Sequence, residues 1–378
     1  MTADFGIIHR LWRYAADSDL LDRAVGEIGV RHLTVPVVGG EECGLRLRDG
    51  GGPRQFATEG GWHFPPHAPR YSSSSIRPRT ARWLGRRDVL AQVCDRAAAR
   101  GLRVVALLNV PAAVGGNEQD EHVLRRNAWG ETVARAGGCP LQPELRELLA
   151  ATLADLERYD LAGYMLAGWE PDSAAGREAL GVLDWSPVAQ RLLNTCFCAA
   201  CRQVATIAGA DPDHAARSAT VHLERLMVTA GDASAEDAIR RDETLLRYDG
   251  IRREANRLWL RQLTLRYARR EWYVLRDCGD ARDAANGIDN VRPVVRIRRG
   301  ADSVRDHSPE QVLRRHGAAG VAIHAWRPTF HEGSALVRWI NEAVERGVWH
   351  FDFDGVDESP DEALVWLRQA VRFARRAS

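Results

Sequence analysis

The stretch DLAGYMLAGWE, residues 160–170, decides the fold of this chain. It is an apolar run of strand length that ends in the carboxylate Glu170, and it follows a helical pattern over residues 143–158. Similar short apolar or β-branched runs alternate along the sequence with longer segments whose apolar residues recur three and four positions apart. This alternation predicts parallel strands joined by helical crossovers rather than a sandwich or a helical bundle.

Seven runs predict strands, and the eighth strand that would close a barrel is ambiguous. The predicted strands cover residues 5–9, 32–38, 103–109, 161–169, 291–297, 319–325 and 348–354, and the predicted helices cover residues 18–28, 85–100, 143–158, 308–316, 333–346 and 360–375. The segment WYVLRDC, residues 272–278, is a candidate fifth strand, but it continues a helical pattern that begins near Tyr248, and we interpret it as helix. The economical fold class is α/β, a (β/α)8 TIM barrel that forms a single catalytic domain over residues 1–378.

Two long insertions account for the length beyond the roughly 250 residues of an ordinary barrel. The first, residues 39–84, is a loop insertion rich in Gly, Pro, Ser and aromatic residues that follows strand 2. Because loops after the carboxyl ends of barrel strands surround the site, we expect it over the active-site face. The second, residues 171–290, is predicted to be a helical insertion after strand 4.

The composition excludes several classes of function. The 52 basic and 51 acidic residues give a net charge of +1, which argues against nucleic acid or an anionic membrane as a partner. No apolar run approaches the roughly 20 residues of a membrane helix and the amino terminus lacks a signal-peptide pattern, so we expect a cytoplasmic protein. The chain contains no lysine, which excludes a Schiff-base aldolase, a pyridoxal phosphate enzyme and a P-loop phosphate binder.

Glu170 is the leading candidate for a general acid because it ends an apolar strand. Trp169 beside it would shield the carboxyl group from water, and such shielding raises a carboxyl pKa toward the value that a general acid needs. The alternative is that Glu170 is an exposed acid that opens the loop EPDS. A second carboxylate is expected from HFDFD, where Asp352 and Asp354 share one face of a strand. Two such carboxylates could flank a glycosidic bond, although these aspartates could equally cap the next turn.

Polar and aromatic residues follow the other predicted strands and are candidates for substrate binding. A site for a sugar ring needs flat apolar faces and hydrogen-bond donors, and the 12 Trp of the chain supply such faces. Each of these residues can also be purely structural. The candidates are His9, Trp12, Asn109, Trp169, Arg296, Arg298, His324 and Trp326.

Cys196, Cys198 and Cys201 form a C-x-C-x-x-C cluster, which is a candidate zinc site. The fourth ligand is open among His214, His222, Cys139 and Cys278, and three thiols without a metal are the alternative. Disulfides are not expected in a reducing cytoplasm. A zinc ion with four protein ligands would be structural, whereas three cysteines and an open position would resemble a catalytic site. The acid/base chemistry proposed for Glu170 requires no cofactor.

From Asn127 to Cys201 the sequence resembles uncharacterised glycoside hydrolase-like TIM barrels. The resemblance rests on NAWGE, then CPLQPELRELLAATLADLERYDLAGYMLAGWE, then CFCAACR in this order, and it covers about a fifth of the chain closely. It implies that Glu170 is the acid after the fourth strand and that Cys196, Cys198 and Cys201 match the family's cysteine cluster. One departure is that glycosidases of the commonest barrel clan carry a carboxylate nucleophile on the seventh strand, where this chain has His324 and Trp326.

We therefore expect a glycoside hydrolase-like enzyme that cleaves or rearranges a glycoside or sugar-like compound, with Glu170 as acid/base and Asp352 or Asp354 as its partner. Its partner molecules would be a small molecule or an oligosaccharide, and a homo-oligomer is left open. The alternatives are a non-catalytic carbohydrate-binding barrel and a specialised-metabolism enzyme on the same scaffold. A metal-dependent amidohydrolase fits less well, because the first strand ends in a single histidine, in IIHRLW.

Overall fold

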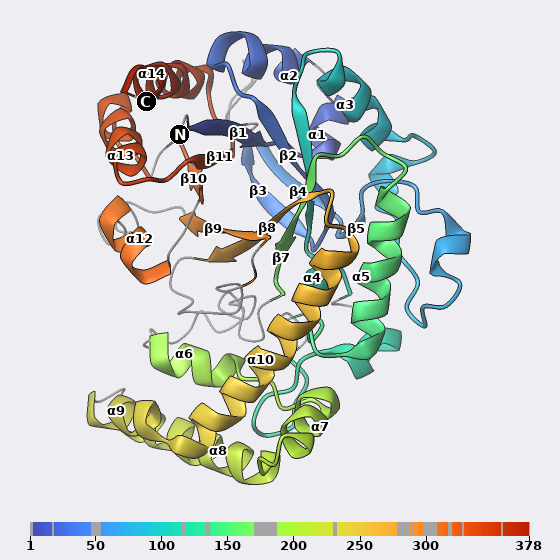
Figure 1. Cartoon of the computed structure of the whole chain (residues 1–378), viewed down its shortest axis with the longest axis vertical. Helices are drawn as coiled ribbons and strands as arrows, with labels where there is room; N and C mark the ends of the chain where they lie inside the picture. Colours follow the sequence, from blue (N-terminus) through green and yellow to red (C-terminus); the bar gives the residue numbers. More distant parts are fainter. Residues whose placement is uncertain are drawn as a thin grey trace.

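The computed structural model describes residues 3–16, 19–46, 54–114, 118–133, 137–169, 187–229, 233–277, 288, 290–297, 308–316, 320–326, 329–356 and 358–377. Among these residues, eight parallel strands close into a barrel with helices around it (Figure 1). In order around the barrel they are β1 (Asp4–Ile8), β2 (His32–Gly39), β6 (Arg103–Leu108), β7 (Gly163–Ala167), β8 (Glu271–Asp277), β9 (Val291–Ile297), β10 (Gly320–His324) and β11 (His350–Asp354). Pairing of β1 with both β2 and β11 completes the ring, which confirms the TIM-barrel prediction.

The helical interpretation of residues 272–278 is wrong, because Glu271–Asp277 form strand β8 between β7 and β9. The preceding helix, α10 (Glu243–Arg266), ends one turn earlier. Within β8, Tyr273 and Leu275 point into the barrel and alternate with Trp272 and Val274, which join the outer core. This alternation of large residues suits a strand covered on both faces. FDFD therefore belongs to the eighth strand of the barrel.

The helices that cover the barrel include those predicted from the sequence, together with two short ones that were not predicted, after the first and third barrel strands. They are α1 (Leu11–Ala16), α2 (Asp19–Arg23) followed by a π-turn (Ala24–Ile28), α3 (Val89–Ala98), α4 (Val110–Ala113), α5 (Pro143–Leu156), α12 (Pro309–His316), α13 (Gly333–Glu345) and α14 (Asp361–Ala377). Their buried residues form one large core with the outward faces of the strands. Helix starts are marked in the sequence, for example by Asp88, whose side chain accepts a hydrogen bond from the amide of Ala91.

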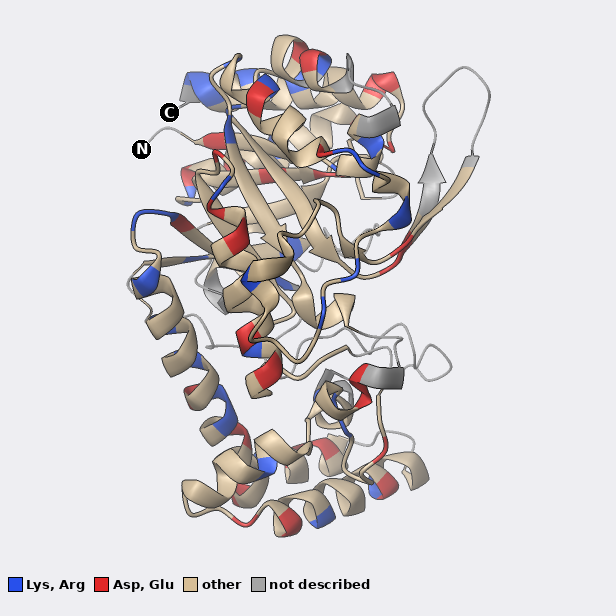
Figure 2. Cartoon of the chain, turned by 90° about the vertical axis from the view of Figure 1, so that its right-hand side faces the viewer, with Lys and Arg blue, Asp and Glu red and all other residues tan. Residues whose placement is uncertain are grey.

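The segment between β2 and α3 forms a hairpin and short turns. The hairpin consists of β3 (Glu42–Arg46) and β4 (Arg54–Thr58) and projects from the barrel (Figure 2). The short strand β5 (Gly61–Trp62) instead pairs antiparallel with the end of β2. Single turns of 3-10 helix follow at Ala68–Tyr71 and Arg82–Leu84. Buried Asp155 of α5 accepts hydrogen bonds from the backbone of His67 (2.8 Å) and from the Tyr71 hydroxyl (3.2 Å). The insertion therefore runs from the mouth of the barrel to helix α5.

A second core lies in the helices between β7 and β8, which stand apart from the barrel at the bottom of Figure 1. These helices are α6 (Pro187–Asn194), α7 (Ala199–Ile207), α8 (Pro212–Val228), α9 (Ala233–Arg241) and α10. Their core includes Phe197 stacked on Tyr248, with ring centroids 4.8 Å apart, and all four cysteines of the cluster described below. A turn of 3-10 helix at Glu118–Val123 precedes the segment that joins this core to the barrel.

Basic and acidic residues are interspersed over the side of the molecule drawn in Figure 2. Among the described residues, no helix is both long enough and apolar enough to cross a lipid bilayer.

Candidate active site

Parallel strands direct their carboxyl ends to one face of the barrel, and most of the predicted site residues lie there. His9 follows β1, Asn109 follows β6, Trp169 follows β7, His324 ends β10 and Asp354 ends β11. Asp354 is paired in register with His324 across β10 and β11. Glu170 and Arg298 lie outside the described residues, as does Cys278.

Asp352 and Asp354 share a strand face, as predicted, but they lie at different depths in the barrel. Asp352 is fully buried and accepts hydrogen bonds from the Thr34 hydroxyl (2.7 Å), His32 Nε2 (3.1 Å) and His350 Nε2 (2.9 Å). Asp354 lies one pleat nearer the mouth, and its side chain is 19% exposed. Of the two, Asp354 is the one that reaches the mouth of the barrel.

The environment of Asp352 fixes its charge. Burial alone would raise its pKa, but the imidazoles of His350 and His32 hold the pKa of this carboxyl group well below its usual range. His32 lies between Asp352 and Asp4, whose carboxylate is 3.2 Å from His32 Nδ1. Burial would lower the pKa of His32, but the two carboxylates outweigh it and raise the pKa to about 9. Asp352 is thus an ionised carboxylate inside the barrel, with the protonated imidazole of His32 beside it.

Small residues make room for these imidazoles. The rings of His32 and His350 are stacked, with centroids 4.5 Å apart. A Cβ atom on Gly6 would lie 2.1 Å from His32 Nε2, and one on Gly320 would lie 3.0 Å from His350 Cδ2. The two glycines therefore admit the histidine rings where side chains from the strands of an ordinary barrel would fill the interior.

At the mouth, three carboxylates surround the guanidinium of Arg10. Arg10 Nε is 2.9 Å from Glu42 Oε2, and Arg10 Nη2 is 3.2 Å from Asp354 Oδ1 and 3.4 Å from Glu358 Oε1. These residues come from the loop after β1, the β3–β4 hairpin, the end of β11 and the loop after it. Glu42 was missed by the sequence reasoning. Its only signal was an acidic pair directly after the Gly-Gly that ends the second strand.

The predicted aromatic residues differ in how much of their rings is free. Trp169 is buried against Trp259, with centroids 5.1 Å apart, and Trp326 is buried against Trp366, with centroids 4.2 Å apart. Trp12 is half-buried and packs against the ring of Phe56 in the hairpin, with centroids 4.8 Å apart. The first two rings therefore build the walls of the barrel end, and Trp12 is the one that retains a partly open face.

The predicted polar residues are also placed by local contacts. His9 is fully buried, and its ring is perpendicular to that of Tyr14, with centroids 6.0 Å apart. His324 Nδ1 lies 3.3 Å from the backbone oxygen of Trp326. Asn109 caps α4 by accepting a hydrogen bond from the amide of Ala112 (3.3 Å). Arg296 is half-buried on the inward face of β9, and its Nε has no hydrogen-bond partner within the described ranges.

The chain on the amino-terminal side of Glu170 is firmly anchored. The backbone oxygen of Gly168 accepts a hydrogen bond from Arg125 Nη2 (3.4 Å), and that of Trp169 accepts one from Asn256 Nδ2 (2.6 Å). Gly168 has φ +73°, and a Cβ atom there would lie 2.5 Å from Asn109 Oδ1. Only glycine accommodates both the left-handed conformation and this close approach. The strand end that leads into Glu170 is therefore fixed by three neighbouring elements.

The cysteine cluster lies in the second core, and the structure selects its fourth member. The Sγ atoms of Cys139, Cys196, Cys198 and Cys201 all lie within 4.8 Å of one another, and all four residues are buried. His222 instead pairs with Asp242, with its Nε2 3.0 Å from the carboxylate, and His214 is exposed. Cys139 is thus the candidate that completes the predicted set.

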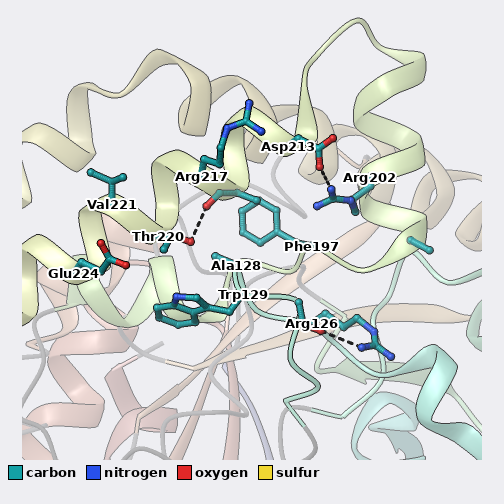
Figure 3. A pocket seen from close by; sticks show the side chains of 13 residues that line it. Arg126, Ala128, Trp129, Phe197, Arg202, Asp213, Arg217, Thr220, Val221 and Glu224 are labelled. Carbon is teal, nitrogen blue, oxygen red and sulfur yellow. Dashed lines mark hydrogen bonds and ion pairs between the residues drawn. The ribbon is translucent and has the colours of Figure 1, made fainter.

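A groove of about 760 Å³ lies beside this cluster, between residues 126–130 and helices α7 and α8 (Figure 3). Its walls include Trp129, Phe197 and Val221, and Arg202 at its edge is paired with Asp213. None of the mouth residues described above lines it. A smaller cavity of about 350 Å³ lies between the first insertion and α4, with Glu41, Glu59 and Arg79 in its walls.

Comparison with known proteins supports the fold. No family model and no curated protein matches this sequence. The β-galactosidase of the psychrophilic Marinomonas ef1 superposes with a TM-score of 0.54 and 12% identity over 98% of this chain, which spans 59% of that enzyme. A β-N-acetylhexosaminidase (TM-score 0.47, 12% identity, 100% of this chain and 74% of that one) and α-L-fucosidase isoenzyme 2 of Paenibacillus thiaminolyticus (0.45, 10%, 98% and 49%) are less similar. The likeness to the β-galactosidase agrees with the TIM-barrel fold described above.

Proposed function

We propose that this protein is a glycosidase-type enzyme that cleaves or rearranges a glycoside or a related sugar-like compound at the carboxyl end of its barrel. The observation that carries the proposal is the anchored strand end, Gly168–Trp169, which precedes Glu170 at the same mouth that holds Asp354. Both backbone oxygens of this dipeptide are hydrogen-bonded, which holds Gly168 and Trp169 in place at the end of β7.

In this proposal Glu170 is the general acid/base and Asp354 is its partner. The acid protonates the leaving oxygen, while the second carboxylate attacks the sugar or activates water. We favour Asp354 over Asp352 because Asp352 is buried and engaged by Thr34 and two histidines. Arg296 would bind a substrate hydroxyl, and Trp12 would supply a face for the ring.

Two specific observations favour a second function. β10 ends in His324, not in a carboxylate, and the Asp354 carboxylate is ion-paired with Arg10. A barrel that binds a carbohydrate without cleaving it would tolerate both features. A specialised-metabolism enzyme on the same scaffold would instead keep Glu170 and act on a different small molecule.

The test is hydrolysis of aryl glycosides that differ in sugar and in leaving-group acidity. We expect at least one sugar to be turned over, and Glu170→Gln to lower kcat by a factor of hundreds or more for poor leaving groups but much less for activated ones, which need no proton. Asp354→Asn should lower kcat for all leaving groups. Asp213→Asn, which alters an exposed ion pair on α8, is the matched control and should leave kcat unchanged.

Two outcomes would contradict the proposal. Activity that survives in Glu170→Gln at every leaving group would remove Glu170 from the mechanism. Saturable binding of a sugar, measured by calorimetry, with no turnover of its aryl glycosides or of the free oligosaccharide, would favour the binding protein.

A further inference from the structure

We propose that Cys139, Cys196, Cys198 and Cys201 bind one Zn²⁺ ion in a closed structural site that joins the helical insertion to the barrel. The proposal is independent of the glycosidase assignment. It rests on four buried thiol groups that converge from two separate segments of the chain.

The spacing of the sulfur atoms fits one metal ion. With Zn–S bonds of about 2.3 Å, the edge of a tetrahedron of thiolates is about 3.8 Å. The four Sγ atoms all lie within 4.8 Å of one another, and those of Cys139 and Cys201 are 3.5 Å apart. A four-iron cluster would bind each thiolate to a different iron, which requires a wider arrangement of sulfurs. Four soft sulfur donors at tetrahedral spacing are the ligand set that zinc prefers.

The surroundings favour thiolates and a metal complex with two net negative charges. The backbone amides of Arg126 and Cys198 approach Cys196 Sγ at 3.4 and 3.5 Å. Arg252 of α10 is fully buried and directs Nε to Cys201 Sγ at 3.5 Å. Arg146 donates a hydrogen bond from Nε to the backbone oxygen of Pro140, next to Cys139, and its guanidinium lies over the ring of Trp259 at 4.9 Å, while its buried Nη2 has no hydrogen-bond partner among the described residues. The guanidinium groups of buried Arg252 and half-buried Arg146 thus stand beside the sulfurs whose charge they would balance.

The ligands come from opposite sides of the junction between the two cores. Cys139 lies just before α5, which packs on the barrel, whereas the other three cysteines lie before and in the first turn of α7. A metal ion bound by all four would connect these segments through covalent-strength bonds. Because all four positions are filled by protein, such a site leaves no position for water or substrate and would have a structural role.

The first test uses the unmodified protein purified without chelators. We expect elemental analysis to find one zinc per chain, and an organomercurial titration to release that zinc as four thiols react. Less than about 0.2 zinc per chain, iron in its place, or a pair of oxidised cysteines detected by mass spectrometry would overturn the proposal. No variant is needed for this measurement, so a folding defect cannot obscure it.

Matched cysteine variants then test the ligand set. Cys139→Ser should lower the zinc content at least fivefold, whereas Cys94→Ser, which alters a buried cysteine of α3 outside the cluster, should retain it. Protein reconstituted with Co²⁺ should show the sulfur-to-cobalt charge-transfer bands of a tetrahedral thiolate site, lost in Cys139→Ser and kept in Cys94→Ser. Equal zinc content in the two variants would exclude Cys139 as a ligand.

The structural role has its own readout. Removal of zinc should make the segment 187–266 the first to be cut in limited proteolysis, while the barrel stays resistant, because the insertion has a small core of its own. If the chelated protein resists cleavage as well as the zinc-loaded protein, the metal does not hold the insertion in place.

Discussion

Replacing Asp352 by asparagine is expected to destabilise the barrel strongly, and to do so more at low pH than at high pH. The substitution keeps the shape of the side chain but removes the charge that faces His32 and His350 inside the barrel. Breaking a buried ion pair by removing one partner costs about 3–5 kcal/mol, because the remaining charge is left without compensation. We therefore expect the free energy of unfolding to fall by about this amount near pH 6.

The pH dependence follows from the raised pKa of His32. A histidine whose pKa is 6.5 when unfolded and about 9 when folded contributes stability that is fully present below pH 6.5. This contribution, about 3 kcal/mol from the difference in pKa, is lost as the pH rises through 9. In Asp352→Asn only Asp4 remains to hold the proton on His32, so the stability of the variant should depend less on pH. The difference between wild type and variant should therefore shrink by up to about 3 kcal/mol between pH 6 and pH 10.

The assay is urea unfolding followed by tryptophan fluorescence at several pH values, with Asp213→Asn as the control. That control alters an exposed ion pair with Arg202 and should cost less than about 1 kcal/mol at any pH. A loss below about 1 kcal/mol for Asp352→Asn near pH 6 would refute the reasoning. So would a loss of the same size at pH 6 and pH 10, because it would mean that His32 carries no proton in the folded protein.

Three further predictions follow from single contacts. Gly6→Ala should lower the free energy of unfolding by about 3 kcal/mol or more, measured by urea unfolding, because its Cβ atom would lie 2.1 Å from the ring of His32; a loss under 1 kcal/mol would show that the ring can move. Asn256→Ala should lower kcat for a glycoside substrate about tenfold while changing KM less than twofold, since it frees the backbone oxygen of Trp169, and an unchanged kcat would exclude a positioning role. Asp155→Ala should lower the thermal midpoint by several degrees by leaving a buried tyrosine hydroxyl and a backbone amide unpaired, and calorimetry that shows no change would contradict this.

The fold could be predicted from the alternation of strands and helices, and the one error has a physical cause. Residues 272–278 follow a 24-residue helix without a glycine or proline between them, so the helical pattern conceals where the strand begins. In the structure the helix ends near Tyr267, and Tyr273 and Leu275 of the following strand pack inside the barrel. Closure of a barrel is a property of the whole sheet, and a local pattern does not carry it.

The candidate site could be predicted only in part. A sequence pattern shows which face of a strand a residue lies on, but not how deeply that residue is buried in the barrel. The period of two placed Asp352 and Asp354 on one face, but it could not show that Asp352 lies among two histidines while Asp354 reaches the mouth. Cys139 could not be distinguished from the other candidate ligands, since 56 residues of chain separate Cys139 from the next cysteine along the sequence. Glu42 reaches Arg10 through a hairpin whose direction depends on packing.

Helix α10 sets a condition on how this protein can change in evolution or be engineered. Arg252, Asn256 and Trp259 lie on one face of the helix and contact Cys201, the Trp169 backbone oxygen and the Trp169 ring, respectively. One residue added or removed between Arg252 and Asn256 would rotate one end by about 100° relative to the other and shift it by about 1.5 Å. Either the cysteine contact or the Trp169 contacts would then be lost. The helical insertion should therefore tolerate changes in length in its other helices. In α10, by contrast, the number of residues between the cysteine contact and the contacts with the end of β7 must stay the same.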